Sequence, residues 1–161
     1  MVLKILIKLF AFVQHHKNSF WIKNPHKAQQ RTFKYLIQKA KKTKFGKDHN
    51  FDKIFNHQDF IKYVPIRDYE KIKSYIEKVK KGEPNILWQG KPLYFSKTSG
   101  TTSGVKYIPI SKESISTHIN SARDAILSYI YYSGNAKIFF GKQIFLQGSP
   151  ILKTINGIKI G

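Results

Sequence analysis

The sequence contains no cysteine and only 9 acidic residues among its 161 positions. Without cysteine, a disulfide scaffold and a thiolate metal site are both excluded. Arginine is also scarce, since only Arg31, Arg67 and Arg123 stand among the 29 basic residues. Base readout and bidentate phosphate recognition favour arginine over lysine. We therefore interpret the net charge of +20 as a solvated lysine surface that attracts polyanions without specificity.

Long apolar runs are missing too. The first candidate, residues 2–13, is interrupted by Lys4 and Lys8 and is shorter than the ~20 residues that span a bilayer. It is not followed by a signal-peptide cleavage site, so a cytoplasmic location is the default expectation. The pattern predicts an amphipathic helix that docks on a core or a partner, with a membrane surface as the less favoured alternative. The expected docking face, opposite the two lysines, carries Leu6, Leu9, Phe10 and Val13.

Hydrophobic residues nevertheless make up 41% of the chain, and aromatic residues 14%. Those fractions are too high for a disordered polyelectrolyte, and 161 residues suit one domain rather than two.

The histidines show neither H-x-x-x-H nor H-E-x-x-H spacing, so we predict no metal site. The histidines are His15, His16, His26, His49, His57 and His118.

The first 80 or so residues carry the signals of helices. Asn24 and Pro25 form a helix start, with asparagine as the N-cap and proline in the first turn, and Gly46 is the expected stop. A short helix is predicted over 57–63, and Asp68 caps the next helix. The apolar stripe of that helix consists of Tyr69, Ile72, Tyr75, Ile76 and Val79.

After residue 84, short strands alternate with one long helix. Strands are predicted at 93–95, 105–110 and 143–147, the helix follows Ser111, and Asn156–Gly157 signals a hairpin. The apolar face of the helix carries Ile115, Ile119, Ala122, Ile126 and Ile130. A helical amino-terminal part followed by strand, loop, strand, helix and strand indicates an α/β fold.

One stretch has a specific chemical interpretation. Residues 98–106, which we call the hydroxyl-rich segment, combine glycines, hydroxyl side chains and a lysine. They include Thr98, Ser99, Gly100, Thr101, Thr102, Ser103, Gly104 and Lys106. The glycines let backbone N–H groups approach an anion, the hydroxyls donate to phosphate oxygens, and the lysine adds a point charge. This composition suits a polyphosphate.

The spacing excludes two other motifs. A Walker A loop requires G-x-x-x-x-G-K-[ST], whereas three residues separate Gly100 from Gly104, and Val105 precedes Lys106. A nucleophile elbow requires G-x-S-x-G, and here the serine stands next to the second glycine. On composition alone, a flexible Ser/Thr/Gly loop is an equal alternative.

The residues around the hydroxyl-rich segment resemble a known family. Residues 95–109, FSKTSGTTSGVKYIP, resemble the phosphate-binding loop of the adenylate-forming superfamily. The serine after the paired threonines and the Ile-Pro after the lysine are similar to the auxin-responsive promoter family of acyl-acid amido synthetases. Residues 43–47, 63–70 and 81–88 resemble the same family, so that the resemblance covers about residues 25–148.

The resemblance implies a ligase that uses ATP and Mg²⁺. Members of the family convert a carboxylic acid into an acyl-adenylate, which the amine of an amino acid then attacks to give an amide. By the same resemblance, Ser99, Gly100, Thr101 and Thr102 would hold the β- and γ-phosphates, with Thr98 and Lys106 as supporting contacts. No catalytic residue and no metal ligand can be carried over.

The family's adenine-binding segment, ribose-binding aspartate and carboxy-terminal domain with its catalytic lysine would lie beyond Gly161. The chain also stops shortly after the predicted hairpin turn, on a strand that has barely begun. We therefore expect residues 1–161 to form the amino-terminal part of the large domain of a longer ligase, and to be inactive alone. The alternative function is a basic module that binds nucleic acid or anionic membranes.

Overall fold

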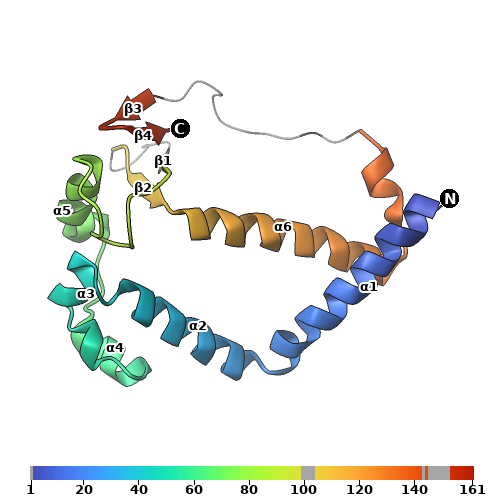
Figure 1. The fold of residues 1–161 in the computed structure, drawn as a ribbon, viewed down its shortest axis with the longest axis horizontal. Coiled ribbons are helices and arrows are strands. Elements are labelled where there is room, and N and C mark those ends of the chain that lie inside the picture. Colours follow the sequence, from blue (N-terminus) through green and yellow to red (C-terminus); the bar gives the residue numbers. More distant parts are fainter. Residues whose placement is uncertain (1, 99–103, 143, 145–152) are drawn as a thin grey trace. The chain divides into compact units, whose positions relative to one another are not determined.

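The computed structural model describes residues 2–98, 104–142, 144 and 153–161 (Figure 1). The chain forms two compact units, each built from two separate stretches. Unit 1 comprises residues 1–29 and 113–147, and unit 2 comprises residues 30–112 and 148–161. The strand predicted at 143–147 lies outside the described residues, apart from Ile144.

Unit 1 contains two long helices and a short 3-10 helix. They are α1 (Val2–Lys23), α6 (Lys112–Ser133) and η2 (Ala136–Phe140) (Figure 1). The buried core is small and consists of Ala11, Leu127, Ile130 and Ala136. The helix predicted after Ser111 is confirmed, and the helix predicted from residues 2–13 extends to Lys23.

The face that α1 buries is the opposite of the predicted one. The expected docking face is exposed: Leu6 to 54%, Leu9 to 57%, Phe10 to 49% and Val13 to 40%. Contact with the rest of unit 1 runs through the fully buried Ala11 and the half-buried Ile7. Lys4 lies on that same side, with its ammonium 5.6 Å from the ring centre of Phe140. Docking of the predicted face on the core of unit 1 is therefore wrong, because α1 packs there through Ala11 and Ile7. Docking of that face on a partner stays a prediction.

The buried face of α6 also differs in part from the prediction. Ile130 is buried as expected, but Ile119 and Ile126 are exposed and Leu127 is buried. Leu127 lies about 100° further round the helix than Ile126, so the packed face is rotated away from the predicted stripe.

A polar contact joins α1 to α6 within unit 1. The side-chain amides of Gln14 and Asn18 donate to one carboxylate oxygen of Asp124, at 3.3 and 3.1 Å. Burial raises the pKa of Asp124, but the hydrogen bonds from Arg123, Asn18 and Gln14 outweigh burial and hold the pKa below its ordinary value.

Unit 2 begins with a series of helices, several of which start at side-chain caps. The helices are α2 (Pro25–Ala40, which begins in unit 1), α3 (Lys44–Asp48), the 3-10 helix η1 (Phe51–Lys53), α4 (His57–Tyr63) and α5 (Tyr69–Lys80). Asn56 and Asp59 form a capping box on α4, and Asp68 accepts the N–H of Lys71 at 2.9 Å to cap α5. The predicted helix starts at Pro25 and His57 and the predicted cap Asp68 are confirmed.

Gly46 does not end α2 as predicted. The helix ends at Ala40, and Gly46 lies buried inside α3. The cause is Thr43, whose hydroxyl donates to the carbonyl of Ala40 at 2.7 Å and accepts the N–H of Gly46 at 3.0 Å. One side chain therefore closes α2 and caps α3. The buried core of this helical part consists of Ile37, Ala40, Phe51 and Ile54.

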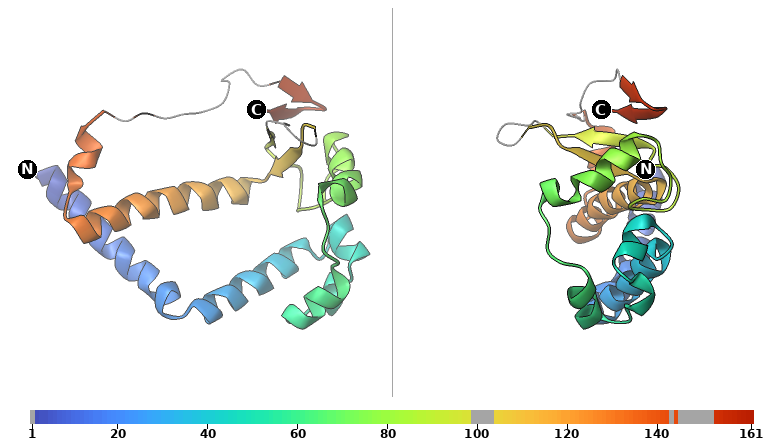
Figure 2. Two further views of the ribbon diagram at one scale, coloured as in Figure 1. Left: turned by 180° about the vertical axis from the view of Figure 1, so that it is seen from behind. Right: turned by 90° about the vertical axis from the view of Figure 1, so that its left-hand side faces the viewer.

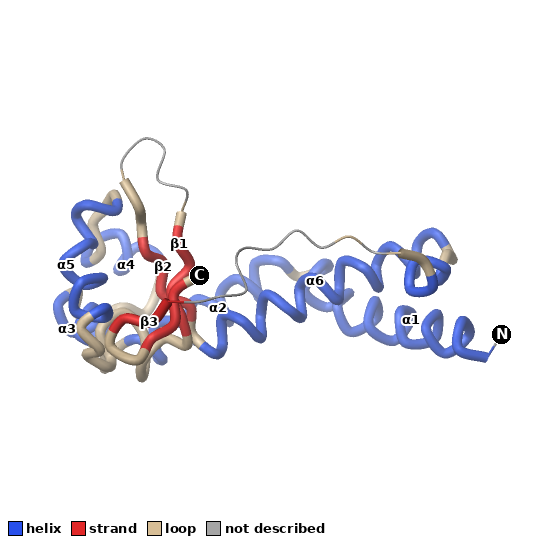
Figure 3. Tube along the Cα trace, turned by 90° about the horizontal axis from the view of Figure 1, so that it is seen from above, coloured by secondary structure: helices blue, strands red, loops and turns tan. Residues whose placement is uncertain are grey.

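A small mixed sheet completes unit 2 (Figure 3). Its strands are β1 (Tyr94–Lys97), β2 (Tyr107–Ile110), β3 (Lys153–Ile155) and β4 (Ile158–Ile160), in the order β2-β1-β4-β3. β1 pairs antiparallel with β2 and parallel with β4, and β3 pairs antiparallel with β4. Helix α5 contacts the sheet at β2 (Figure 2). The core between them contains Val79, Ile86, Phe95, Ile158 and Ile160.

The predicted hairpin is confirmed, and its second strand is better integrated than expected. Asn156 and Gly157 form the turn with φ angles of 49° and 78°. β4 is an inner strand rather than an open edge, because Tyr94 and Phe95 of β1 pair with Lys159 and Ile160. The turn is also tied to α5, since the Asn156 amide donates to the carbonyl of Lys80 at 2.7 Å.

The α/β prediction is thus confirmed at the level of helices with a small mixed sheet. None of the described helices has the length and hydropathy needed to cross a lipid bilayer.

Candidate functional site

The hydroxyl-rich segment leaves the sheet at the end of β1 and returns at the start of β2. Its two ends are joined by a pair of hydrogen bonds. The N–H of Thr98 donates to the carbonyl of Lys106 at 3.1 Å, and the N–H of Lys106 donates to the hydroxyl of Thr98 at 3.2 Å. These bonds continue the antiparallel register in which Lys97 pairs with Tyr107. The base of the segment is therefore closed.

Of the predicted site residues, Thr98, Gly104 and Lys106 are described, and Ser99, Gly100, Thr101, Thr102 and Ser103 lie outside the described residues. Gly104 has a φ of 77°, a conformation that favours glycine. A Cβ added there would meet nothing within 4 Å, so the backbone conformation rather than space requires the glycine.

Lys106 is the positively charged residue of the hydroxyl-rich segment. It is half-buried, and its ammonium lies 5.8 Å from the centre of the Tyr69 ring. Within the part of the chain that the structure describes, the ion pairs use other basic residues. The charge of Lys106 is therefore not neutralised by a carboxylate and is available to an anion.

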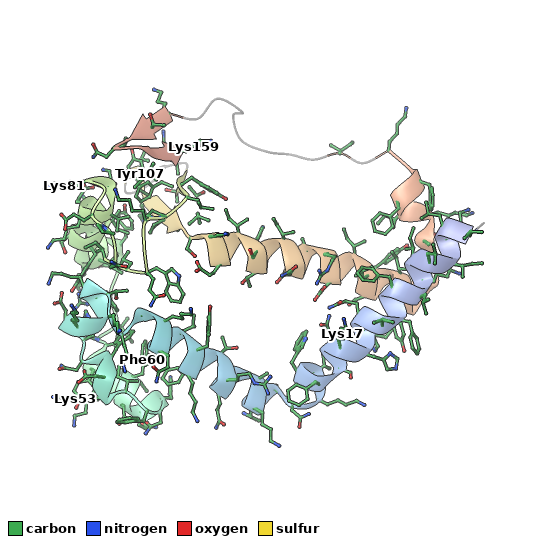
Figure 4. All side chains as sticks on the ribbon, in the orientation of Figure 1. Lys17, Lys53, Phe60, Lys81, Tyr107 and Lys159 are labelled. Carbon is green, nitrogen blue, oxygen red and sulfur yellow. The ribbon has the colours of Figure 1, made fainter. Side chains whose placement is uncertain are left out.

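Tyr107, the first residue of β2, anchors the returning strand (Figure 4). Its N–H donates to the hydroxyl of Tyr69 at 2.9 Å, and its ring packs edge-on against Phe95 with 6.2 Å between ring centres. The ammonium of Lys80 lies 4.5 Å from the centre of the same ring. Two residues of α5, Tyr69 and Lys80, therefore contact the residue that follows Lys106.

The residue pattern does not mark Tyr69 or Tyr107 as site residues. Periodicity marked Tyr69 as one of five apolar-stripe positions, and it carries no information on the partner of a hydroxyl. The sequence signal for this contact is a tyrosine at the first position of a capped helix. That this position faces an edge strand is seen in the structure.

A second polar cluster of unit 2 links two other stretches of the family resemblance. The N–H groups of Lys44 and Phe45 donate to the carbonyls of Asn85 and Ile86, at 2.7 and 3.0 Å. These bonds tie residues 43–47 to residues 81–88. The cluster thus has an evident structural role.

Asp48 is the charged centre of this cluster. Its carboxylate accepts from the ammonium of Lys44 and from the hydroxyl of Tyr75, each at 2.8 Å. The hydrogen bond from Lys44, followed by that from Tyr75, holds the pKa of Asp48 below its ordinary value. Burial, followed by the hydrogen bond to Asp48, raises the pKa of the Tyr75 hydroxyl.

The neighbouring His49 is buried. Its Nδ1 lies 2.7 Å from the carbonyl oxygen of Phe45, which can only accept, so Nδ1 carries the proton. Its Nε2 is buried with no hydrogen-bond partner among the described residues. The ring stacks on Phe45 with 4.0 Å between ring centres, as expected for a core histidine. Among the described residues, no group of three or more His, Asp or Glu side chains could hold a metal ion.

A comparison of the sequence with known protein families identifies the family of the chain. The family model of the GH3 family N-terminal domain matches residues 15–161. The chain belongs to the GH3 family. The resemblance seen around the hydroxyl-rich segment is thereby confirmed.

Two GH3 relatives show the extent of the match. The chain is 37% identical over 107 residues to the indole-3-acetic acid-amido synthetase GH3.15 of Arabidopsis thaliana, covering 64% of this chain and 18% of that protein. It is 23% identical over 142 residues to the jasmonoyl–L-amino acid synthetase JAR4 of Nicotiana attenuata, covering 86% of this chain and 24% of that protein. The chain thus spans a quarter or less of the length of these relatives.

The fold agrees with solved GH3 structures. The structure of the GH3.15 acyl acid amido synthetase superposes with a TM-score of 0.69 at 22% identity, over 84% of this chain and 24% of that one. The same enzyme in complex with 2,4-DB gives a TM-score of 0.70 at 23% identity. At this identity the match establishes the fold.

Proposed function

We propose that this GH3 chain supplies the phosphate-binding part of an ATP-dependent acyl-acid amido synthetase. The relatives are named as an indole-3-acetic acid-amido synthetase and a jasmonoyl–L-amino acid synthetase, which supports the reaction class. In that reaction the carboxylate of an acid attacks the α-phosphate of ATP, and pyrophosphate leaves. The amine of an amino acid then attacks the acyl carbon, giving an amide and releasing AMP.

The observation that carries the proposal is the closed base of the hydroxyl-rich segment. The N–H of Thr98 and the N–H of Lys106 each take part in a hydrogen bond between these two residues, which fixes the position of both. Donors and charges that are already in place stabilise phosphate charge better than groups that must be ordered on binding. The fixed Thr98 hydroxyl and the charge of Lys106, which is unpaired among the described residues, favour a binding site.

Lys106 and the hydroxyls have complementary tasks in this proposal. The Lys106 ammonium supplies the full charge, and the hydroxyls of Thr98, Thr101 and Thr102 supply directed donors to the outer phosphates. Mg²⁺ usually retains several waters and binds through substrate phosphates. We accordingly assign no described side chain to the metal.

Binding of pyrophosphate with Mg²⁺ to this chain tests the proposal, because pyrophosphate offers the phosphates without the nucleoside. We expect Lys106→Gln to weaken binding about 10-fold or more, since it removes a charge-assisted contact. The matched control is Lys159→Gln, which removes an exposed lysine of the same sheet and leaves binding unchanged (Figure 4). Equal losses in the two variants would indicate attraction by net charge alone and would overturn the proposal.

A second set of variants examines the hydroxyls. Thr101→Ala and Thr102→Ala should each weaken pyrophosphate binding by about 10-fold, because each removes one donor to a charged oxygen. Their urea midpoints should match that of the unaltered chain. Isothermal titration calorimetry measures the affinity for pyrophosphate. An unchanged affinity in both variants would show that the two threonines are not part of the site.

A further inference from the structure

We propose that Tyr69 is a positioning residue for the phosphate site: its hydroxyl fixes the start of β2, and its ring holds the ammonium of Lys106. This inference rests on the proposed function and deepens it. It makes helix α5, which contributes no predicted phosphate ligand, the element that sets where the charge of Lys106 lies.

The first step concerns the backbone. β2 is an edge strand, and Lys106 directs its N–H and carbonyl toward Thr98 on the β1 side. Because successive backbone groups of a strand alternate in direction, the N–H of Tyr107 points to the open edge. The Tyr69 hydroxyl accepts it there at 2.9 Å. Without this oxygen, a half-buried backbone donor loses its partner.

The second step concerns the lysine side chain. A lysine has four rotatable side-chain bonds and samples many conformers unless its ammonium is held. The Tyr69 ring lies 5.8 Å from the Lys106 ammonium, within the range of a cation–π contact. The contact holds the charge without neutralising it. A carboxylate at this place would compete with a phosphate, and an aromatic face does not.

The third step concerns the rigidity of the support. Tyr69 occupies the first position of α5, directly after the Asp68 cap. The same helix buries Ile76 and Val79, and Val79 packs in the sheet core with Phe95 and Ile158. Lys80, near the other end of α5, lies over the Tyr107 ring. Tyr69 is therefore mounted on an element that is fixed to the sheet at several points.

Two substitutions separate the contributions of the hydroxyl and the ring. Tyr69→Phe removes the acceptor and keeps the ring, and Tyr69→Leu removes both. We expect pyrophosphate with Mg²⁺ to bind about 3- to 10-fold more weakly to Tyr69→Phe and about 10- to 30-fold more weakly to Tyr69→Leu. In Tyr69→Phe the amide hydrogen of Tyr107 should also exchange faster with solvent. Tyr75→Phe is the control, since Tyr75 is on the same helix and donates to Asp48.

A double-variant cycle distinguishes positioning from a general effect on folding. If Tyr69 acts through Lys106, then Tyr69→Leu causes no further loss of affinity once Lys106→Gln is present. An equal loss with and without Lys106, or unchanged Tyr107 exchange and affinity in Tyr69→Phe, would overturn the inference. If Lys106→Gln alone left affinity unchanged, the phosphate site would fail, whereas Tyr107 exchange would still report on the hydrogen bond.

Discussion

At the scale of single residues, Gly46 occupies a position where the backbone leaves no room for a side chain. A Cβ at this residue would fall on the carbonyl oxygen of Ala40 and lie 2.9 Å from the Cα of Lys41. Both are backbone atoms, so they cannot rotate away. The tight junction between α2 and α3, closed by Thr43, thus depends on the missing methyl group.

Helix propensity and packing predict opposite effects for Gly46→Ala. Alanine inside a helix stabilises by about 0.5–1 kcal/mol over glycine, whereas overpacking costs roughly 1–3 kcal/mol. We expect the clash to dominate and the urea midpoint to fall. Gly141→Ala is the control, because a Cβ at Gly141 meets nothing within 4 Å and its φ is −96°. Equal stability of Gly46→Ala and the unaltered chain would show that the junction can relax.

Asp48 makes a pH-dependent contribution to stability. Its pKa is lowered in the folded chain, so the stabilisation is fully present above the ordinary value of 3.8 and is lost as the pH falls through the lower folded value. We expect Asp48→Asn to have a lower urea midpoint at pH 7, by about 0.5 M or less for so exposed a group. The difference should shrink below pH 3.8. A difference that persists at pH 2 would assign the effect to packing.

At the scale of elements, helix α1 is held by its smaller side chains. Ala11 is fully buried, whereas Leu9 exposes 57% of its surface. We expect Ala11→Leu to destabilise unit 1 by roughly 1–3 kcal/mol through overpacking. Leu9→Ser should change stability by less than about 0.5 kcal/mol. Amide hydrogen exchange in α1 and α6 measures both changes in stability. A larger effect of Leu9→Ser than of Ala11→Leu would show that α1 packs through the face predicted from the sequence.

Elements whose start depends on neighbouring residues were predictable. Asn56 with Asp59 and Asp68 fix two helices through local caps, and Pro25 starts a third. Asn156–Gly157 fixes the hairpin through its positive φ angles. Each of these signals acts over a few residues. These helix starts and the hairpin could therefore be predicted from the sequence alone.

Features that depend on distant contacts were not predictable. The buried side of α1 is chosen by Leu127, Ile130 and Ala136, more than 100 residues away. The parallel pairing of β4 with β1 joins residues 65 positions apart. In the candidate site, the motif predicted Thr98 and Lys106 as site residues. The contacts of Tyr69 with Lys106 and Tyr107 were missed, because contacts between distant residues leave no periodic pattern in the sequence.

At the scale of the whole molecule, two surface properties oppose each other. Large apolar side chains are exposed on both units, among them Leu6, Leu9, Ile66 and Ile144. Such surfaces favour association. The net charge of +20 opposes it, because like-charged chains repel over a Debye length of about 10 Å in 0.1 M salt and about 3 Å in 1 M salt.

Salt should therefore have opposite effects on self-association and on polyanion binding. We expect the average mass in analytical ultracentrifugation to rise between about 50 mM and 1 M salt, and Leu6→Ser with Leu9→Ser to reduce the rise. Binding to DNA duplexes should be indifferent to sequence and weaken steeply between roughly 50 and 200 mM salt. Sequence-selective binding that survives the higher salt would favour a nucleic-acid-binding module instead.

The division of each unit into two stretches has a consequence for synthesis on the ribosome. Helix α1 is made before its partners Leu127 and Ile130, which follow more than 100 residues later. At about 5–20 residues per second, α1 waits roughly 5–20 s for them. During that interval Ala11 and Ile7, which are covered in the folded unit, are exposed to solvent together with the apolar face that includes Leu6 and Leu9. We therefore expect helix α1 to need protection from aggregation on the nascent chain, as holding chaperones provide.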